Sequence, residues 1–451
     1  MKKLRIFYGW WIIAAGVCIA AMTSTFFVYG FSAFFIPWRD QFNWSRGSLG
    51  AIVGLSRLEG GLVAPISGYL IDRYGPRKMM FFGVGLMGVG FIALRWVSSL
   101  THLYIVFLAL LAVGSSFGTG RPLQVAAANW FIRKRGRAMG LLMSGYGIGG
   151  SLVFLFAMLI ENSGWQTAAL VAGIIMWGIG FPLILIIRHK PEHLGLFPDG
   201  ITPSENTDPL TNESNTDSHT DSPLKQPSKP KFWQRDTRPE LDLTTWQAIR
   251  TQAFWMMALT YAVFAGVPGI TTVHLAPFLA EELNLEYVLA VAALSGFVAA
   301  SVVGRIGFGF IADFMNIKIL TAFLLLMVSA TLYLFSTIQT LSQVPLYVIC
   351  FGLAYGGIIP LRGVLQGYFF GRTSFGTVGG LLQFVDLPAT VAAPWFIGFL
   401  ADEIAGGYRV GFKLIALFVS TAVVAILLAK RPRPPLPNDA PPSIFKRNPS
   451  K

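Results

Sequence analysis

Apolar residues in this chain gather in runs that are long enough to cross a bilayer. A spanning helix needs about 20 mostly apolar residues, because the hydrocarbon core is about 30 Å thick and an α-helix rises 1.5 Å per residue. The pattern predicts twelve spanning helices, at 9–36, 48–71, 79–98, 103–131, 138–160, 166–187, 253–279, 287–311, 318–336, 343–369, 376–400 and 410–429. The first run continues from Tyr8 to about Pro37, which is too long for a secretion signal, so it is predicted to be a retained helix.

One long polar stretch interrupts the pattern. Residues 202–230 are rich in Ser, Thr, Asn, Asp and Pro and contain almost nothing that builds a core. We therefore expect a six-helix bundle at 1–190, a largely disordered cytoplasmic linker at 191–250, a second bundle at 251–430 and a cytoplasmic tail at 431–451. Whether the linker is regulatory is left open.

Composition agrees with lipid as the main solvent. Of the 451 residues 54% are hydrophobic and only 13% are charged, too few for the surface of a soluble protein of this length. The net charge of +13 does not indicate nucleic-acid binding, because the basic residues lie between the apolar runs. Cys18 and Cys350 supply neither a disulfide framework nor a metal cluster, and no catalytic or nucleotide-binding constellation is present, so we expect no cofactor and no enzyme.

Charge in the short loops predicts the orientation. Basic residues cluster on one side of the predicted membrane, at Lys2, Lys3, Arg5, Arg73, Arg77, Lys78, Arg133, Lys134, Arg135, Arg137, Lys430, Arg431 and Arg433. The opposite side carries acidic residues, at Glu161, Glu281, Glu282, Glu286, Asp402 and Glu403. Cytoplasmic loops carry the excess of Lys and Arg, so both termini are predicted to be cytoplasmic in a multi-pass protein of the cell's inner (plasma) membrane.

Polar residues also show that the two halves repeat. Asp72 and Asp313 end similar segments that begin at Gly68 and Gly309, and both pairs are separated by 241 residues (313 − 72 and 309 − 68). The same offset relates Arg121 to Arg362 (362 − 121), and it also relates Glu161 to Asp402 (402 − 161). Two repeats of equal orientation predict an all-α protein with a pseudo-two-fold axis along the membrane normal and a substrate site between the halves near mid-membrane.

The segment between the second and third spans carries a family resemblance. It reads Gly68-Tyr-Leu-Ile-Asp72-Arg73-Tyr-Gly75-Pro-Arg77-Lys78, and it looks like the loop signature of the major facilitator superfamily. The resemblance implies a conformational latch, formed by Gly68, Asp72, Arg73, Gly75, Arg77 and the repeated Asp313. In such a latch Asp72 contacts helix N-termini or an arginine of the other half.

A second segment resembles one branch of that superfamily. It runs from Asn129 to Gly150, including Arg133-Lys-Arg135-Gly-Arg137, and is similar to the loop and fifth helix of monocarboxylate transporters and oxalate–formate exchangers. The start Tyr8-Gly-Trp-Trp11 and the run His274-Leu-Ala-Pro277 are also similar to that branch. The resemblance implies secondary transport of a small organic anion by a protein that functions as a monomer.

One further motif has a different explanation. Gly83-Val-Gly85-Leu-Met-Gly88 matches the dinucleotide-binding fingerprint, but it lies inside an apolar run with no preceding strand. We predict that these glycines serve close packing between helices.

Ionisable residues inside the spans are the candidates for function. An arginine at the bilayer centre costs about 2.5–3.5 kcal/mol on insertion scales, so it needs a partner or a water-filled cavity. Four arginines lie well inside spans, at Arg57, Arg121, Arg305 and Arg362. Against them stand Glu59, His274 and Asp386, so positive charge is in excess. A carboxylate substrate is a natural partner, because a guanidinium binds a carboxylate with two hydrogen bonds.

Arg305 is the first candidate for substrate binding, because the resemblance implies a substrate-contacting arginine on the eighth helix. Its alternative is an arginine that reaches the membrane interface or pairs with a loop. Arg121 and Arg362 come second, as a repeat-related pair facing across the cavity beside Pro122 and Pro360, and pairing between helices is their alternative.

Tyr29 and His274 complete the predicted substrate set. Asp386, Glu59 and Arg57 are candidates for proton coupling or for a structural ion pair, with an Arg57–Asp386 pair between the second and eleventh spans expected.

The coupling ion stays open at this point. Monocarboxylate carriers of animals have an Asp one turn before the eighth-helix Arg where this chain has Ser301, and Tyr29 lies near their first-helix Lys. Proton symport and anion exchange are both retained. A carrier of another solute (a larger organic anion, a siderophore-like compound or a drug) and a transporter-like solute sensor remain alternatives.

Overall fold

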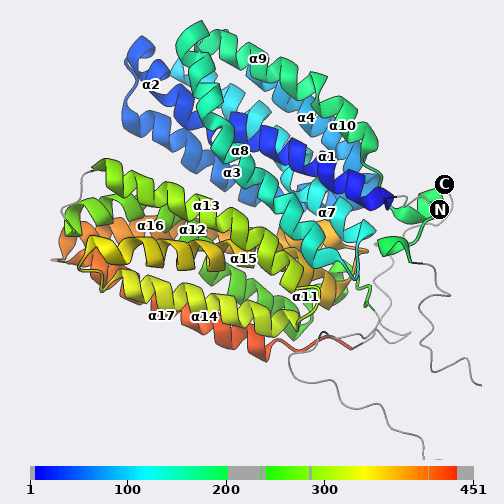
Figure 1. Ribbon diagram of the computed structural model, residues 1–451. Coiled ribbons are helices and arrows are strands. Elements are labelled where there is room, and N and C mark those ends of the chain that lie inside the picture. The colour runs from blue at the N-terminus through cyan, green and yellow to red at the C-terminus, as the bar shows by residue number, and fades with distance from the viewer. Residues whose placement is uncertain (1–5, 202–234, 236–239, 284–286, 405, 434–451) are drawn as a thin grey trace, which may run out of the picture.

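The computed structural model of the chain describes residues 6–201, 235, 240–283, 287–404 and 406–433. In these ranges the helices divide into two bundles that lie side by side along their length (Figure 1). The stretch 202–230, predicted to be a disordered linker, lies outside the described residues.

The first bundle contains six spans, three of which consist of segments joined end to end. Its helical segments are α1 (Tyr8–Thr23), α2 (Gly30–Phe42), α3 (Arg46–Tyr74), α4 (Pro76–Leu94), α5 (Leu100–Ile105), α6 (Val113–Gly118), α7 (Gly120–Trp130), α8 (Arg135–Ser163), α9 (Trp165–Gly178) and α10 (Gly180–Ile186). α1 and α2 form one span, α5 to α7 form another, and α9 continues into α10.

The second bundle also contains six spans. Its helices are α12 (Gln252–Glu282), α13 (Tyr287–Ile311), α14 (Ile317–Phe335), α15 (Val344–Phe370), α16 (Phe375–Glu403) and α17 (Gly407–Leu428), preceded by the short α11 (Thr245–Ile249). In total, twelve helices of the described residues are long and apolar enough to cross a membrane, which confirms the predicted number.

Each bundle has its own hydrophobic core. Trp38, Trp130 and Phe91 are fully buried in the first core, and Phe351, Phe369 and Phe412 are fully buried in the second. Large apolar side chains also cover the outer surface, as expected of helices that face lipid, for example Trp395 with 69% exposure.

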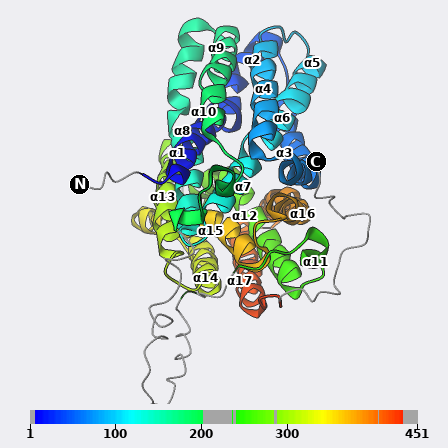
Figure 2. The ribbon, with the colours of Figure 1, turned by 90° about the vertical axis from the view of Figure 1, so that its right-hand side faces the viewer.

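Two helix pairs join the bundles along the seam. α3 of the first bundle packs on α16 of the second, and α8 packs on α13 (Figure 2). Glycines permit this close approach, because a Cβ on Gly68 of α3 would lie only 2.1 Å from the carbonyl oxygen of Gly376. The two pairs are equivalent under the predicted pseudo-two-fold axis, which relates α3 to α13 and α8 to α16.

We call the two ends of the bundles the terminal face and the far face. The terminal face is the end at which α1 begins and α17 ends, and it includes the α3–α4 junction (Figure 1). The far face is the opposite end. Gly75 makes the α3–α4 turn with φ of +87°, a conformation that only glycine adopts readily.

The fourth span is broken in its middle. α6 stops at Gly118, and Thr119 has φ −130° and ψ −86° before α7 starts at Gly120. Pro122 explains the break, because a proline ring has no N–H and displaces the carbonyl four residues earlier. Pro360, the proline beside Arg362, lies inside an unbroken α15, and it is not the repeat equivalent of Pro122, which the 241-residue offset relates to Gly363.

The Gly83–Gly88 run lies within α4, as predicted. A Cβ on Gly83 would lie 2.1 Å from the amide nitrogen of Gly118, whereas the nearest atom to a Cβ on Gly85 is 3.7 Å away. The run therefore serves helix packing, and the two glycines are not equivalent.

This difference makes a matched test of the packing. We expect Gly83→Ala to lower the free energy of unfolding by about 1–3 kcal/mol, because α4 and α6 must separate to admit the methyl group. Gly85→Ala should leave stability unchanged or raise it slightly. Thermal unfolding of the purified protein in detergent measures both variants, and equal midpoints for the two would contradict the packing argument.

Candidate functional site

A cavity of about 590 Å³ lies between the two bundles. Its walls come from the first, second and fourth spans and from Tyr146 of α8 on one side, and from α12, α15 and α16 on the other. Val53 and Phe107 line it about two turns from the far ends of their spans, so the cavity extends from mid-membrane toward the far face.

Ionised side chains gather in this cavity. It is lined by Arg57, Glu59, Arg121, Arg362 and Asp386, together with polar groups such as Gln383, Ser115 and Thr119. The cavity therefore collects three of the four intramembrane arginines and both intramembrane carboxylates that the sequence singles out.

Arg362 and Asp386 form an ion pair inside the second bundle. Arg362 Nη1 lies 2.5 Å from Asp386 Oδ2, and the guanidinium stands over the ring of Tyr261 with its carbon 5.0 Å from the ring centroid. Arg362 Nη2 and Asp386 Oδ1 have no hydrogen-bond partner among the described residues. The pair thus keeps one donor and one acceptor unused at the cavity wall.

Arg121 approaches the same place from the first bundle. Its Nη2 donates a hydrogen bond to Gln383 Oε1 on α16, and Gln383 Nε2 donates to the carbonyl of Gly60 at 3.4 Å. The charges of Arg121 and Arg362 are close enough to repel, while Asp386 attracts Arg121. Arg121 lies nine residues from the end of α7 and Arg362 eight from the end of α15, about 12–14 Å along each helix.

Arg57 and Glu59 have no charged partner of their own among the described residues. Arg57 is exposed to the cavity and makes no hydrogen bond or ion pair. Both carboxylate oxygens of Glu59 are buried without a hydrogen-bond partner at normal distance, and the nearest polar influence is the hydroxyl of Ser116. The two residues are two positions apart on α3 and therefore do not face each other.

The predicted Arg57–Asp386 pair is wrong in this structure. The second and eleventh spans do pack together, as expected, but Asp386 turns toward Arg362 of its own bundle. Helix proximity alone does not decide the partner, because α16 packs more extensively on α3 than on α15. Asp386 lies on the side of α16 that meets Arg362, and a buried carboxylate binds the cation that it reaches directly.

Arg305 lies outside the cavity lining. It is 9% exposed on α13, and its Nη1 donates to the carbonyl of Met143 on α8 at 2.9 Å. Arg305 therefore ties α13 to α8 in this conformation, an arrangement that is neither its expected place in the substrate site nor the interface or loop contact given as its alternative.

Tyr29 and His274 are also away from the lining. Tyr29 lies against Gly150 of α8, where it follows a π-helical turn at Ser24–Val28. His274 Nε2 is 2.8 Å from the carbonyl of Pro394 and packs beside Tyr408. Neither residue meets the cavity arginines here, so their predicted substrate roles have no support from this arrangement.

The bundles are joined at the terminal face by two equivalent contacts. Asp72 accepts hydrogen bonds from the backbone N–H groups of Gly376 and Thr377 at 2.8 and 2.7 Å, and from the Thr377 hydroxyl at 2.7 Å. Asp72 thus meets the first turn of α16, where unpaired N–H groups and the helix dipole favour an anion.

Asp313 makes the corresponding contact with α8. It accepts from the N–H of Gly136 at 2.8 Å and pairs with Arg137 Nε at 2.5 Å. Burial raises the pKa of the Asp313 carboxyl, and the hydrogen bonds and charge of Arg137 and Gly136 oppose that rise. The repeat found in the sequence therefore ends in two carboxylates that each hold a helix N-terminus of the other bundle. Arg73 and Arg77, from the same motif, instead contact Tyr69, Tyr74 and Phe81 of the first bundle.

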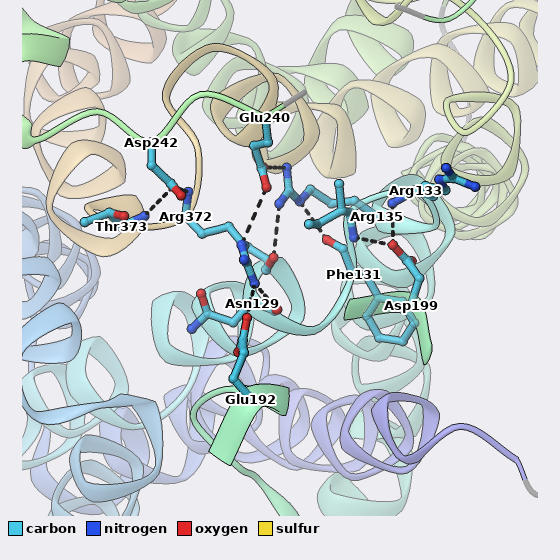
Figure 3. A network of polar contacts seen from close by, with 12 residues as sticks. Asn129, Phe131, Arg133, Arg135, Glu192, Asp199, Glu240, Asp242, Arg372 and Thr373 are labelled. Carbon is cyan, nitrogen blue, oxygen red and sulfur yellow. Dashed lines mark hydrogen bonds and ion pairs between the residues drawn. The ribbon is translucent and has the colours of Figure 1, made fainter. Parts of the chain in front are cut away.

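Described residues on either side of the stretch 202–230, which fall inside the predicted 191–250 linker, add a second layer to this face (Figure 3). Asp199 accepts hydrogen bonds from three consecutive N–H groups before α8, those of Ile132, Arg133 and Lys134. Asp242 does the same before α16 for Arg372 and Thr373.

Two glutamates in these segments cross between the bundles (Figure 3). Glu240, which precedes α11, pairs with Arg135 at 2.6 Å and lies 3.5 Å from Arg372. Glu192, which follows α10, pairs with Arg372 at 3.2 Å. The terminal face is thus closed by backbone-directed carboxylates and by ion pairs, while the cavity lies toward the other face.

Sequence reasoning missed the residues that complete the site. Gln383 and Tyr261 are neutral and lie in apolar helices, where nothing in the pattern separates them from packing residues. Asp199 and Glu240 flank a polar stretch and look like ordinary solvated charges. Gln383 lies within one turn of Asp386 on the same helix, and this proximity is the sequence signal that could have identified it as a site residue.

Most of the chain matches known transporters. The family model described as Major Facilitator Superfamily matches residues 17–387. The chain belongs to the major facilitator superfamily. It is 23% identical over 436 residues to monocarboxylate transporter 12 of Mus musculus, covering 94% of this chain and 86% of that protein. It is 29% identical over 189 residues to the oxalate:formate antiporter of Oxalobacter formigenes, covering 41% and 44%. The human organic anion transporter MFSD10 has the same fold, with a TM-score of 0.64 at 11% identity over 92% of this chain and 98% of that one.

The two aspartate contacts at the terminal face make a testable prediction. In a Cys18→Ser, Cys350→Ser background, a Ser67→Cys probe lies on α3 beside Gly68 of the seam, at the edge of the cavity, and is nearly inaccessible because Ser67 is 1% exposed. Asp72→Asn removes a charge-assisted contact worth about 1.5–3 kcal/mol, so maleimide should label the probe about ten- to a hundredfold faster.

Asp313→Asn should increase labelling in the same way, and so should lowering the pH through the raised pKa of Asp313. Asp40→Asn is the matched control, because Asp40 pairs with Arg39 near the far face and touches neither seam. Unchanged labelling in both latch variants would show that these contacts do not hold the terminal face closed.

Proposed function

We propose that this chain is a secondary active transporter that moves a small organic anion through the cavity between its bundles by alternating access. The observation that carries the proposal is the charge of the cavity lining. Three arginines face two carboxylates there, and one carboxylate is already engaged by Arg362. With all groups ionised the lining carries one net positive charge (3 − 2), and with Glu59 protonated it carries two.

An anionic solute fits this imbalance. Arg57 has no partner, Arg121 meets only a neutral amide, and Arg362 keeps a free donor, so a carboxylate between them would receive hydrogen bonds from both bundles. A solute that binds donors of both bundles favours the closure of the bundles around it. Solute binding would in this way be coupled to the movement of one bundle relative to the other. We assign substrate binding to Arg57, Arg121 and Arg362, and Arg305 stays a candidate for the conformation that opens at the terminal face.

The sizes of the known relatives' substrates favour a small carboxylate. One relative is named as a monocarboxylate transporter and another as an oxalate:formate antiporter. A cavity with one to two net positive charges suits a monoanion or a dianion of that kind. We therefore propose lactate, formate or oxalate as the first compounds to test.

The conformation fits one step of the transport cycle. If the terminal face is cytoplasmic, as the excess of Lys and Arg there predicts, the cavity faces outward in this structure. The same proposal includes two bundles at 1–190 and 251–430 joined by a cytoplasmic linker, location in the inner (plasma) membrane, and function as a monomer. Opening inward requires the contacts of Asp72 and Asp313 to break.

Glu59 is our candidate for the proton-coupling group. It is the carboxylate of the cavity that lacks a cation, so protonating it breaks no ion pair, whereas protonating Asp386 would release Arg362. Proton symport then adds a positive charge to the lining as the anion arrives, and exchange without protons uses the fixed arginines alone.

Arg57 gives the cleanest test of anion binding, because its replacement leaves no carboxylate unpaired. We expect Arg57→Gln to weaken binding and uptake of lactate, formate or oxalate about tenfold to a hundredfold, which corresponds to a charge-assisted hydrogen bond worth about 1.5–3 kcal/mol. Uptake into proteoliposomes and binding by calorimetry measure the effect. Arg95→Gln, an exposed arginine at the far end of α4, is the control.

The same assays decide between the arginines and between function classes. Loss of uptake in Arg305→Gln but not in Arg57→Gln would return the substrate site to Arg305. Anion that binds but never accumulates or exchanges would identify a solute sensor. If the cavity binds none of the three carboxylates but binds a larger anion, the protein is still a carrier and its substrate is that larger anion.

Replacing Glu59 separates the two coupling modes. We expect Glu59→Gln to abolish uphill uptake driven by an imposed pH gradient and to retain exchange against preloaded anion. Ser116→Ala is the control, because it alters the group beside Glu59 without changing a charge. Wild-type protein that shows no response to a pH gradient would instead identify an exchanger.

A further inference from the structure

A second hollow lies at the terminal face, on the α3–α16 side of the seam. It measures about 470 Å³ and is bounded by the α3–α4 junction, by the segment after α10 and by the loop before α16. The cationic residues in its wall are Arg73, Arg77, Lys78, Arg188, Lys190 and Arg372. This basic pocket is separate from the transport cavity, because no residue lines both.

The pocket has a counterpart on the other side of the seam. Asp72 lines the basic pocket, and Asp313, its equivalent in the second repeat, lines the counterpart. The loop before α16 contributes to the basic pocket, and the loop before α8 contributes to the counterpart. The counterpart is only about 80 Å³, and Arg235 lies in it. Arg235 donates hydrogen bonds to the carbonyl oxygens of Ile132 and Asp313 at 3.0 Å each, and also to that of Arg133.

The two pockets therefore differ in how their charges are met. In the counterpart, Arg135 pairs with Glu240 and Arg235 binds carbonyl oxygens, so groups of the same chain satisfy one another there. The basic pocket presents cations, and Asp72, the carboxylate in its wall, is already used by Gly376 and Thr377. A hollow of this kind calls for an anion that comes from outside the chain.

The charges in the basic pocket are largely uncompensated. Arg73 contacts the hydroxyl of Tyr69 and the ring of Tyr74, and Arg77 stands over Phe81. Lys78, Arg188 and Lys190 have no side-chain partner among the described residues. Of the six cations, Arg372 is the one with carboxylate partners, Glu192 and Glu240. Five cations around one hollow repel one another unless a counter-ion is present.

We propose that the basic pocket binds a phosphate-bearing anion, either the headgroup of an anionic lipid or a free phosphate compound. A phosphate group carries several acceptor oxygens and more than one negative charge in its free form, so it can meet several cations at once, which a monocarboxylate cannot. Basic pockets between helices at the cytoplasmic end of membrane proteins bind such headgroups by the same chemistry.

Binding in this pocket also acts on the seam. Arg372 and Thr373 come from the second bundle, and the other residues of the wall come from the first. An anion bound between them attracts cations of both bundles. It therefore stabilises the closed terminal face together with the contact that Asp72 makes with α16. The proposal does not depend on the identity of the transported solute.

The test uses the purified full-length protein and the double variant Arg188→Gln, Lys190→Gln. Pyrophosphate is titrated against the detergent-solubilised protein, with sodium chloride at equal ionic strength, and the thermal unfolding midpoint is followed. In a second arm, the protein is held in nanodiscs of phosphatidylcholine with or without phosphatidylglycerol, and retained lipid is measured by native mass spectrometry. We expect a saturable response to at least one anion in the wild type and at least a tenfold loss of apparent affinity in the variant.

Matched variants keep the outcome interpretable. Arg95→Gln, Lys413→Gln also removes two positive charges, from exposed positions near the far face, and should bind like the wild type. Arg73→Gln, Lys78→Gln replaces the first double variant if that one does not fold. Retained phosphatidylglycerol without a pyrophosphate response assigns the pocket to a lipid headgroup, and the reverse assigns it to a free phosphate compound. The proposal is overturned if chloride acts as well as pyrophosphate and no phosphatidylglycerol is retained, or if the pocket variants bind as tightly as the wild type.

Discussion

In the hydrocarbon core of a membrane no water is available to a charge, and each ionised side chain must meet a partner or a cavity. The four arginines inside this chain meet the requirement in four ways. Arg362 pairs with Asp386, Arg121 binds the amide of Gln383, Arg305 donates to the carbonyl of Met143, and Arg57 faces the cavity. Three of these solutions place positive charge on one hollow between the bundles, and the proposed anion site follows from that convergence.

The halves meet through two joints at equivalent positions of the repeat. Asp72 and Asp313 each hold the N-terminus of a helix in the other bundle, where the helix dipole and free N–H groups stabilise a carboxylate. Glycines along α3 and α8 bring the backbones close enough for these bonds to form, since the short side chain of Asp reaches little beyond van der Waals contact. Both joints lie at one end and hold the bundles together at the terminal face, while the cavity extends toward the far face.

The described ends of the predicted 191–250 linker take part in the same joint. Glu240 and Glu192 each reach a cation of the opposite bundle, and Asp199 and Asp242 fix the two loops that precede α8 and α16. The symmetry of the repeat breaks where the chain's own Arg235 fills one pocket and leaves the other hollow and cationic. Closure of this face thus depends on parts of the chain that are not repeated.

The sequence by itself determined the number of spans and the equivalence of the two halves. Hydropathy predicted the twelve spans, because burying backbone polar groups in lipid demands continuous apolar helices, and the 241-residue offset predicted which charges are equivalent. The pattern contains no information on the distances between spans, and those distances decided which partner each buried charge has. Asp386 took Arg362 instead of Arg57, and Arg305 took a backbone carbonyl, because a buried charge binds the nearest suitable group in three dimensions, whatever its separation along the chain. Which neutral residues complete the site, Gln383 and Tyr261 among them, likewise depended on how the helices turn toward one another, and only the tertiary structure sets that.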